Sequence, residues 1–347
     1  MDTAAPEPLP WLAPTVARAL AMPHAHALLL HGAAGDGLLE CANTLVHAWL
    51  CEATDEPRPC GHCGACRLLA GGLHPDLHRL MPEALRQQLG LAGAEAGDGA
   101  EDEGGGKSRR KPSRQIRIDE VRAAIDWVAT TSSRGRAKVV LVHPAEAMNL
   151  QAANALLKTL EEPPRGARLL LTAAEPAQLL PTVRSRCQVV RLAPPDAASA
   201  RAWLQAQGLA QPEVLLAACS QRPLDALAMA AAGIDASRWA ALPAAVLARQ
   251  AAALSGWALP RVVEALQKLC HDGLAVACGG APRFFPPQAL PAPASAGALA
   301  AWGRDLARLA RQADHPWNEG LWLDAQLARA AAAWRGERVE GSDTLAA

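Results

Sequence analysis

The sequence predicts an α/β core built on a parallel sheet, carrying an inserted four-cysteine zinc module and followed by two all-α domains. Three observations support this fold class. Short apolar runs alternate with amphipathic segments over the first 195 residues, four cysteines fall within sixteen residues, and strand-like runs cease after residue 196. Strands that alternate with helices pair in parallel, in a sheet that helices cover on both faces.

The predicted strands are short apolar runs, and helical patterns separate them. The runs lie at 26–31, 138–143, 168–174 and 187–192, with a weaker candidate at 76–82. Amphipathic segments lie at 37–50, 117–130 and 149–162. One face of the last segment carries Leu150, Ala153, Leu157 and Leu160. The Pro-Pro pair at 163–164 ends this helix.

Two further stretches divide the chain. Residues 90–114 combine glycine, acidic residues and then a basic run, which predicts a solvated, mobile loop. The basic run offers a DNA contact as an alternative, but the acidic residues directly before it favour a mixed-charge linker. After Asp196, a plausible helix N-cap, only helical patterns follow. They predict a small helical domain at 196–240 and a larger one at 241–347.

Composition excludes several classes of protein. Lys and Arg together number 34, as do Asp and Glu, so the formal net charge is zero. This argues against a protein that coats nucleic acid by bulk electrostatics. The first residues lack the pattern of a signal peptide, and no run approaches about 18 apolar residues, so we expect no membrane span. We therefore expect a cytoplasmic protein, whose thiols stay reduced.

Four closely spaced cysteines predict a metal site. They are Cys51, Cys60, Cys63 and Cys66, in a C-x8-C-x2-C-x2-C pattern. Four thiolates suit tetrahedral Zn²⁺, with Zn–S bonds of about 2.3 Å, and they leave no open position for water. We therefore predict structural zinc, with disulfides as an alternative that the reducing compartment disfavours. The other five cysteines are predicted to be small core residues.

A phosphate-binding loop is predicted at 31–40, but it lacks the groups that bind phosphate. Three glycines permit its turn: Gly32, Gly35 and Gly37. A working loop places a lysine on the β- and γ-phosphates and a hydroxyl on Mg²⁺, whereas Leu38 and Leu39 occupy those positions here. Asp36 adds a carboxylate. Each such charge-pair change is worth about 4 kcal/mol at an effective dielectric of about 20, so we expect no ATP on this chain.

The acidic residues of an ATPase are also missing. A strand that feeds an ATPase Mg²⁺ site would end in Asp-Glu. The strand at 138–143 ends instead in His143 followed by Pro144, and Glu146 comes two residues late. We predict that His143 is a strand-end histidine with a satisfied hydrogen bond, and that the chain does not hydrolyse ATP.

Motifs between 138 and 195 resemble a known family. "NALLKTLEEPP" at 154–164, "LLLTAAEPAQLLPTVRSRC" at 169–187 and "LAPP" at 192–195 are similar to bacterial clamp-loader subunits of the AAA+ family. With the four-cysteine insertion and the degenerate phosphate loop, the chain resembles the delta-prime family of the DNA polymerase III clamp loader. The matching motifs cover about residues 26–195, and the remainder matches in order and length.

The resemblance implies the domain roles and the partners. Residues 1–195 would form an AAA+ core with the zinc module at about 51–66, residues 196–240 a lid, and residues 241–347 a collar that joins a five-membered ring. The chain would be a non-hydrolysing part of a DNA-directed DNA polymerase holoenzyme. Its neighbours would be delta and gamma/tau subunits, and the assembled complex would place a sliding clamp on primer-template DNA.

The resemblance also assigns one catalytic residue. Arg186, in "SRC" at 185–187, matches the family's arginine finger and would reach the γ-phosphate held by a neighbouring subunit. Alternatively, Arg186 or Arg184 pairs with a local carboxylate. In the lid, Leu224 occupies a position that is arginine in ATP-binding members, and Arg222 lies two residues earlier. This departure weakens any role of the lid in sensing a nucleotide.

Two other functions are weighed against this one. An ATP-hydrolysing gamma/tau-like subunit is the main alternative. A lysine within 36–39 or a carboxylate at 143 would favour it, and the sequence has neither. A zinc-ribbon nucleic-acid binder would need a basic, aromatic-rich cysteine loop. The loop "CEATDEPRPCGHCGAC" contains three acidic residues, one arginine and no aromatic residue, which disfavours that function.

Overall fold

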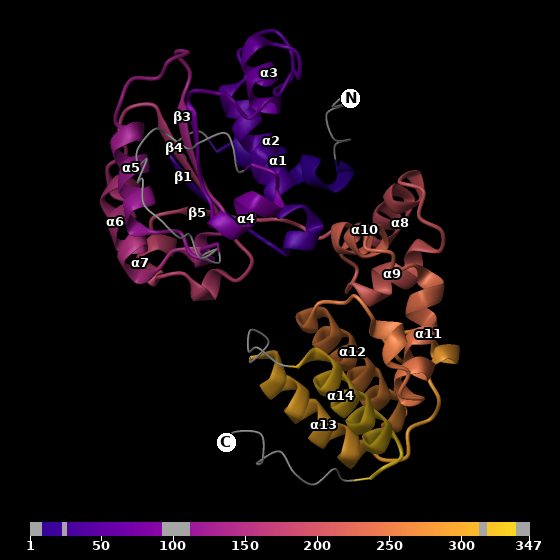
Figure 1. Ribbon diagram of the computed structural model, residues 1–347. Helices are drawn as coiled ribbons and strands as arrows, with labels where there is room; N and C mark the ends of the chain where they lie inside the picture. The colour runs from indigo at the N-terminus through magenta and orange to yellow at the C-terminus, as the bar shows by residue number, and fades with distance from the viewer. Residues whose placement is uncertain (1–8, 23–25, 92–111, 312–317, 338–347) are drawn as a thin grey trace, which may run out of the picture. The chain divides into compact units, whose positions relative to one another are not determined.

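The computed structural model describes residues 9–22, 26–91, 112–311 and 318–337. The chain forms two compact units, Met1–Asp196 and Ala197–Ala347, which are described separately below (Figure 1). Most of the loop predicted at 90–114 lies outside the described residues. None of the described helices is long and apolar enough to cross a lipid bilayer.

The first unit is built on a parallel sheet of five strands. The strands are β1 (Ala27–His31), β2 (Leu77–Leu80), β3 (Lys138–Val142), β4 (Ala167–Ala173) and β5 (Gln188–Arg191). Their order across the sheet is β2-β3-β4-β1-β5, and every pair is parallel. All five predicted strands are confirmed, including the weaker one, and the sheet supports the predicted α/β, AAA+-like core.

Helices cover both faces of this sheet (Figure 1). One face is covered by α1 (Ala13–Leu20) and α2 (Leu38–Leu50), and the other by α5 (Ile118–Val128), α6 (Leu150–Glu161) and α7 (Pro181–Arg184). The first unit also contains α3 (Gly64–Ala70) and α4 (Glu83–Gln88). Because helices pack on both sides, residues of the central strands β1, β3 and β4 are buried whichever way they face. Leu28, Leu29 and Leu30 are therefore all at most 1% exposed.

Helix α6 buries a face that only partly matches the predicted one: Ala153 and Leu160 are buried as predicted, Leu157 is partly buried, and Leu150 is not buried. Leu156 and Leu160 are buried as an i, i+4 pair, whereas Leu150 is 62% exposed. The buried face is centred near Leu156, and at about 100° per residue Leu150 lies roughly a third of a turn away from that centre. The side chain of Asn149 caps the helix by accepting a hydrogen bond from the backbone N–H of Ala152 at 2.8 Å.

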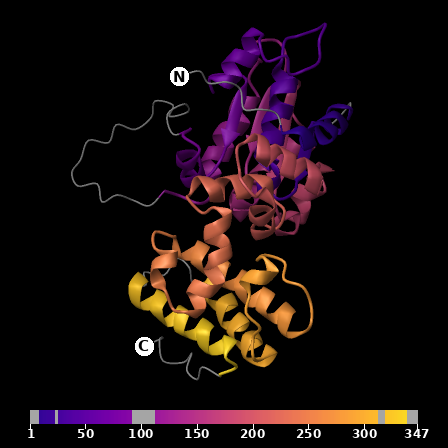
Figure 2. The same cartoon turned by 90° about the vertical axis from the view of Figure 1, so that its right-hand side faces the viewer.

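The described part of the second unit is helical. Its helices are α8 (Ala197–Ala206), α9 (Pro212–Ala218), α10 (Pro223–Ala231), α11 (Ala236–Leu247), α12 (Leu259–Ala277), α13 (Ala296–Ala310) and α14 (Glu319–Trp334). Figures 1 and 2 both show α12, α13 and α14 side by side. The predicted boundary at 240–241 falls within α11. The division into lid and collar stays a prediction.

A buried aspartate organises the second unit. Asp272 in α12 is 0% exposed, and its carboxylate accepts hydrogen bonds from the backbone N–H groups of Arg283, Phe284 and Phe285 at 2.7–2.9 Å. The ring of Phe285 then stacks on Trp239 at a centroid distance of 4.6 Å. The carboxylate therefore fixes a loop whose aromatic residue belongs to the core.

Substitution of Asp272→Ala should destabilise the protein by about 3 kcal/mol or more, because each buried donor left unpaired costs about 1–3 kcal/mol. The matched control is Asp235→Ala, which removes an N-cap that accepts from the backbone N–H of Arg238 and should cost about 1 kcal/mol. Urea unfolding of both variants measures the difference. Equal losses in the two variants would contradict the role given to Asp272.

Candidate functional site

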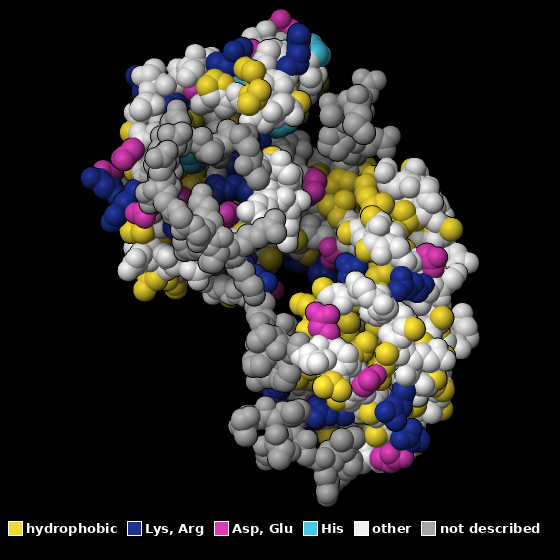
Figure 3. Space-filling view, viewed as in Figure 1, with side chains coloured by type: hydrophobic (Ala, Val, Ile, Leu, Met, Phe, Trp, Pro, Cys, Tyr) yellow, Lys and Arg dark blue, Asp and Glu magenta, His cyan; other side chains and the backbone are white. Residues whose placement is uncertain are grey.

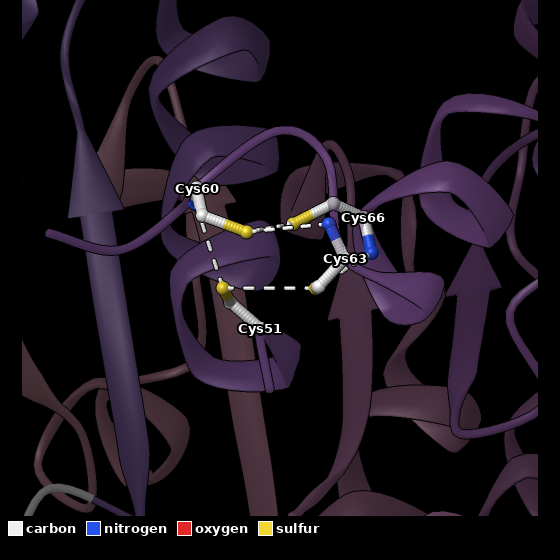
Figure 4. A group of neighbouring side chains, drawn as sticks. All are labelled: Cys51, Cys60, Cys63 and Cys66. Atoms are coloured by element: carbon white, nitrogen blue, oxygen red, sulfur yellow. Dashed lines mark hydrogen bonds between the residues drawn. The ribbon is translucent and has the colours of Figure 1, made fainter. Parts of the chain in front are cut away.

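The four predicted metal ligands come together in space (Figure 4). Cys51 caps the end of α2, Cys60 lies in the following loop, Cys63 caps the start of α3, and Cys66 lies within α3. Their sulfur atoms all lie within 4.8 Å of one another, and two Sγ···Sγ distances, 51–63 and 60–66, are 3.9 Å. A tetrahedron with Zn–S bonds of about 2.3 Å has edges of about 3.8 Å. The cluster could therefore bind a metal ion.

The surroundings of these sulfur atoms favour a thiolate at Cys63. The backbone N–H groups of Cys60, Cys63 and Cys66 each donate to a preceding cysteine sulfur at 3.4 Å. Burial raises the pKa of Cys63, but hydrogen bonds with the backbones of Glu52 and Cys66 and with the thiols of Cys66 and Cys60 together bring that pKa down to about 6. Burial raises the pKa of Cys66. Neighbouring sulfurs do not all ionise unless a cation neutralises them.

The disulfide alternative does not fit this geometry. A disulfide requires sulfur atoms about 2.05 Å apart, and all nine cysteines are free. Of the five cysteines predicted to lie in the core, Cys41, Cys187, Cys219 and Cys270 are buried, as expected. Cys278 is exposed, which corrects that prediction. It follows the last residue of α12 and lies outside the helix's buried stripe.

Ion pairs attach the cysteine loop to the rest of the first unit. Arg134 donates from Nε to Glu52 Oε1 at 2.7 Å, and Glu52 directly follows Cys51. The loop around Arg134 is itself fixed by Asp76, which is 0% exposed. The Asp76 carboxylate accepts from the backbone N–H groups of Ser133 and Arg134 at 2.7 and 3.0 Å, and from the hydroxyl of Ser132. These contacts connect the segment next to Cys51 to the buried Asp76.

The degenerate phosphate loop keeps its turn between β1 and α2. Gly37 has φ of 96°, a left-handed conformation that disfavours other residues, and α2 begins at Leu38. Leu38 is 1% exposed, so its side chain belongs to the core rather than to a ligand site. Leu39 is only partly buried, and Asp36 is buried within the turn.

The segment before α1 covers this loop, a feature that the sequence reasoning missed. Trp11 donates from Nε1 to the carbonyl oxygen of Asp36 at 2.7 Å. The side chain of Leu9 lies so close to Gly37 that a Cβ at position 37 would be 2.6 Å from its Cδ1. Glu40 Oε2 lies 3.7 Å from the same point and brings a further carboxylate. The apolar run "LPWLAP" at 9–14 was the available signal.

His143 occupies the strand end where an ATPase would carry an acidic residue. Its side chain is buried, and Nδ1 lies 2.7 Å from the hydroxyl oxygen of Thr172. Burial lowers the pKa of His143 to about 4, so the ring is neutral near pH 7. Glu146 accepts from the backbone N–H of Glu175 at 2.8 Å. Both residues are held by partners of their own unit.

Arg186 lies at the surface between α7 and β5, and its side chain is 32% exposed. Its Nε donates to Glu161 Oε1 at 2.6 Å, Nη2 pairs with the same oxygen, and Nη1 donates to the carbonyl oxygen of Thr182 at 2.9 Å. Arg184 is exposed. The local carboxylate considered from the sequence is thus Glu161, which no local motif indicated.

In the second unit, Arg222 is engaged near its own position in the chain. Its Nε donates to the carbonyl oxygen of Cys219 at 3.0 Å and lies 2.9 Å from Asp225 Oδ2. Asp225 belongs to α10, which Arg222 precedes directly. The residue thus acts as a local helix-end contact, and Leu224 carries no charge to add to it.

Comparison with known proteins identifies relatives across most of the chain. A family model described as "DNA polymerase III, delta subunit" matches residues 17–196. The delta-prime subunit of Pseudomonas aeruginosa DNA polymerase III is 39% identical over 219 residues, which are 62% of this chain and 58% of that protein. The delta-prime subunit of Escherichia coli is 32% identical over 288 residues, 77% of this chain and 78% of that protein.

A second kind of subunit is also similar. The tau subunit of Escherichia coli DNA polymerase III is 32% identical over 162 residues, which are 47% of this chain and 20% of that protein. The matches thus span a little over half of the Pseudomonas relative, most of the Escherichia delta-prime relative and a fifth of the tau relative.

The cysteine cluster should bind one divalent metal ion per chain. Substitution of Cys63→Ser should weaken zinc binding by at least about 100-fold, since even the loss of a residue that only orients a ligand costs about 10–100-fold. Metal content by mass spectrometry and a chelator titration measure the effect. The matched control is Cys278→Ser, an exposed cysteine of the second unit. Full retention of zinc by Cys63→Ser would contradict the assignment.

His143 should make stability depend on pH. The folded-state pKa of His143, about 4, lies below the ordinary value of 6.5. The free energy of unfolding that the neutral ring contributes is therefore complete above pH 6.5 and is lost as the pH falls toward 4. At pH 5 the loss is about 2 kcal/mol. In His143→Gln, the difference in unfolding free energy between pH 7 and pH 5 should shrink by that amount, as measured by urea titration. An unchanged difference would contradict the assignment.

Proposed function

The chain belongs to the delta-prime family of DNA polymerase III subunits, and we propose that it acts as a clamp-loader subunit that does not hydrolyse ATP itself. Within the polymerase holoenzyme it would assemble with delta and gamma/tau subunits. Through that complex it would help to load the sliding clamp on primed DNA. The observation that carries the proposal is the covered, lysine-free phosphate loop at Gly37 and Leu38.

The loop supports the absence of ATPase activity by two routes. The first is electrostatic, because the loop offers no cation for the β- and γ-phosphates and no hydroxyl for Mg²⁺. The second is steric, because Leu9 and Trp11 already lie against the turn. The similarity to a tau subunit makes an ATP-hydrolysing gamma/tau-like role the alternative. That role would require ATP to bind without a lysine or an Mg²⁺-binding hydroxyl and to displace Leu9 and Trp11 from the turn.

The partly exposed Arg186 supports a contribution to catalysis in trans. A guanidinium at a subunit boundary stabilises the charge that develops on a phosphate held by the neighbouring subunit. Its present pairing with Glu161 involves partly exposed side chains, and such a pair is worth about 0.2–1 kcal/mol. A γ-phosphate carries more charge than one carboxylate, so exchange of Glu161 for the phosphate is energetically accessible.

Structural zinc is the metal that suits the cysteine cluster best. Cys51, Cys60, Cys63 and Cys66 would hold it through four thiolates, the arrangement of closed structural zinc sites. Such a site contributes folding free energy and supplies no reactive position. The zinc would thus stabilise the segment between α2 and α3 rather than take part in chemistry.

The arginine assignment is tested in a loader rebuilt with Arg186→Ala, with only the adjacent ATP site left active. Clamp- and DNA-stimulated hydrolysis at that site should fall by at least about 100-fold, because a finger in trans contributes about 10³–10⁵ in rate. Arg184→Ala, two residues earlier and exposed, is the matched control and should keep the rate. Turnover unchanged by Arg186→Ala would remove the assignment.

The absence of ATP binding is tested separately on the isolated chain. Calorimetric titration with Mg·ATP should give no binding heat, and Mg·ATP should leave the melting temperature unchanged, because a ligand that binds only the folded state raises it. Micromolar binding would instead favour the gamma/tau-like alternative.

A further inference from the structure

A cavity of about 760 Å³ lies in the first unit, at the end of the sheet opposite the phosphate loop. His26, Ala137 and Gly166 line it, and each directly precedes a strand, β1, β3 or β4. The phosphate loop follows the other end of β1. The cavity is therefore separate from the position that a nucleotide occupies in a phosphate-loop protein. Its volume is within the range of small-ligand sites, about 300–1,000 Å³.

The charged side chains on the wall of this cavity are all of one sign. Arg58, Arg136 and Arg168 line it, and no aspartate or glutamate does so among the described residues. This contrasts with the face of the molecule in Figure 3, where Lys and Arg side chains lie interspersed with Asp and Glu. In a chain with zero net charge, three arginines without a carboxylate form a local positive site.

Arg168 is a partly buried cation with no acidic partner among the described residues. It lies in β4 and is only partly exposed, with its guanidinium 5.0 Å from the centre of the Trp49 ring. Burial lowers the pKa of Arg168, and no negative charge of the described residues opposes this effect. In the described chain it forms no ion pair. Partial burial of an unpaired cation is unfavourable, and a cation–π contact offsets only part of the cost.

The three arginines come from separate segments that the fold holds in place. Arg58 lies in the cysteine loop between Cys51 and Cys60, whereas Arg136 follows Arg134, whose backbone is fixed by Asp76. Arg134 also pairs with Glu52 of the cysteine loop. The contacts of Asp76 and Glu52 thus hold the backbone near Arg136 and the start of the cysteine loop, which reduces the conformational entropy that ligand binding costs there.

Phosphate groups match this arrangement better than a single carboxylate does. A guanidinium binds phosphate or carboxylate oxygens through two parallel N–H donors. A carboxylate carries one charge and can accept from the paired N–H donors of one guanidinium. Linked phosphates carry several charges and offer more acceptor oxygens. We propose that the cavity lined by Arg58, Arg136 and Arg168 binds phosphate groups, either a free diphosphate or consecutive phosphates of a single DNA strand.

Pyrophosphate titrated into the full chain by calorimetry tests the proposal. Binding should weaken about tenfold in Arg168→Ala, and also in Arg58→Ala and Arg136→Ala, whose exposed side chains can be removed without disturbing the fold. The matched control is Arg165→Ala, an exposed arginine three residues before Arg168 that does not line the cavity. Absence of pyrophosphate and oligonucleotide binding, or binding that none of the three substitutions changes, would overturn the proposal.

A competition experiment identifies the source of the phosphate. A fluorescent single-stranded oligothymidylate that pyrophosphate displaces, and that the three arginine substitutions weaken, would indicate a DNA strand. Pyrophosphate binding without any oligonucleotide binding would indicate a free diphosphate. A glutamate-rich peptide that binds the cavity more tightly than either probe would overturn the assignment to phosphate.

Discussion

The start of α2 sets the main constraint on the first unit. A helix N-terminus carries unpaired N–H groups and partial positive charge, which a bound phosphate would neutralise. Here aliphatic side chains take that place: Leu38 is buried, and Leu9 lies against Gly37. Trp11 holds the turn through the carbonyl oxygen of Asp36. A nucleotide would have to displace this apolar contact, and no lysine is present to offset the cost.

Two residues outside the phosphate loop, His143 and Arg186, differ in how firmly their partners hold them. At the strand end where an ATPase would carry a metal-binding carboxylate, the His143 ring is neutral and lies within hydrogen-bonding distance of the Thr172 hydroxyl. The partly exposed Arg186 is different, because its partner Glu161 lies on the surface, where an ion pair is weak. The interior of the unit is thus fixed, while an arginine at its surface can exchange partners.

The sequence predicted the sheet well because its signals are local. Short apolar runs mark the three central strands β1, β3 and β4, which are buried on both faces, and even the weaker run that forms β2 was found. The cysteine spacing was equally local. Three features were not predicted from the sequence: Leu150 is exposed, Leu9 covers Gly37, and Arg186 pairs with Glu161. Each depends on segments that only the tertiary fold brings together, and for Arg186 the partner is 25 residues away.

The cysteine cluster and the arginine-lined cavity are held by the same contacts, the Glu52–Arg134 ion pair and the hydrogen bonds of Asp76. Arg58 lies in the loop that Cys51 and Cys60 enclose, and Glu52 at the start of that loop pairs with Arg134. Asp76 fixes the backbone at Arg134, two residues before Arg136 of the cavity wall. A metal ion on the four sulfurs would restrict the loop and hence the position of Arg58. A metal ion bound there would thus help to position Arg58, which lies two residues before Cys60, in the wall of the proposed phosphate site.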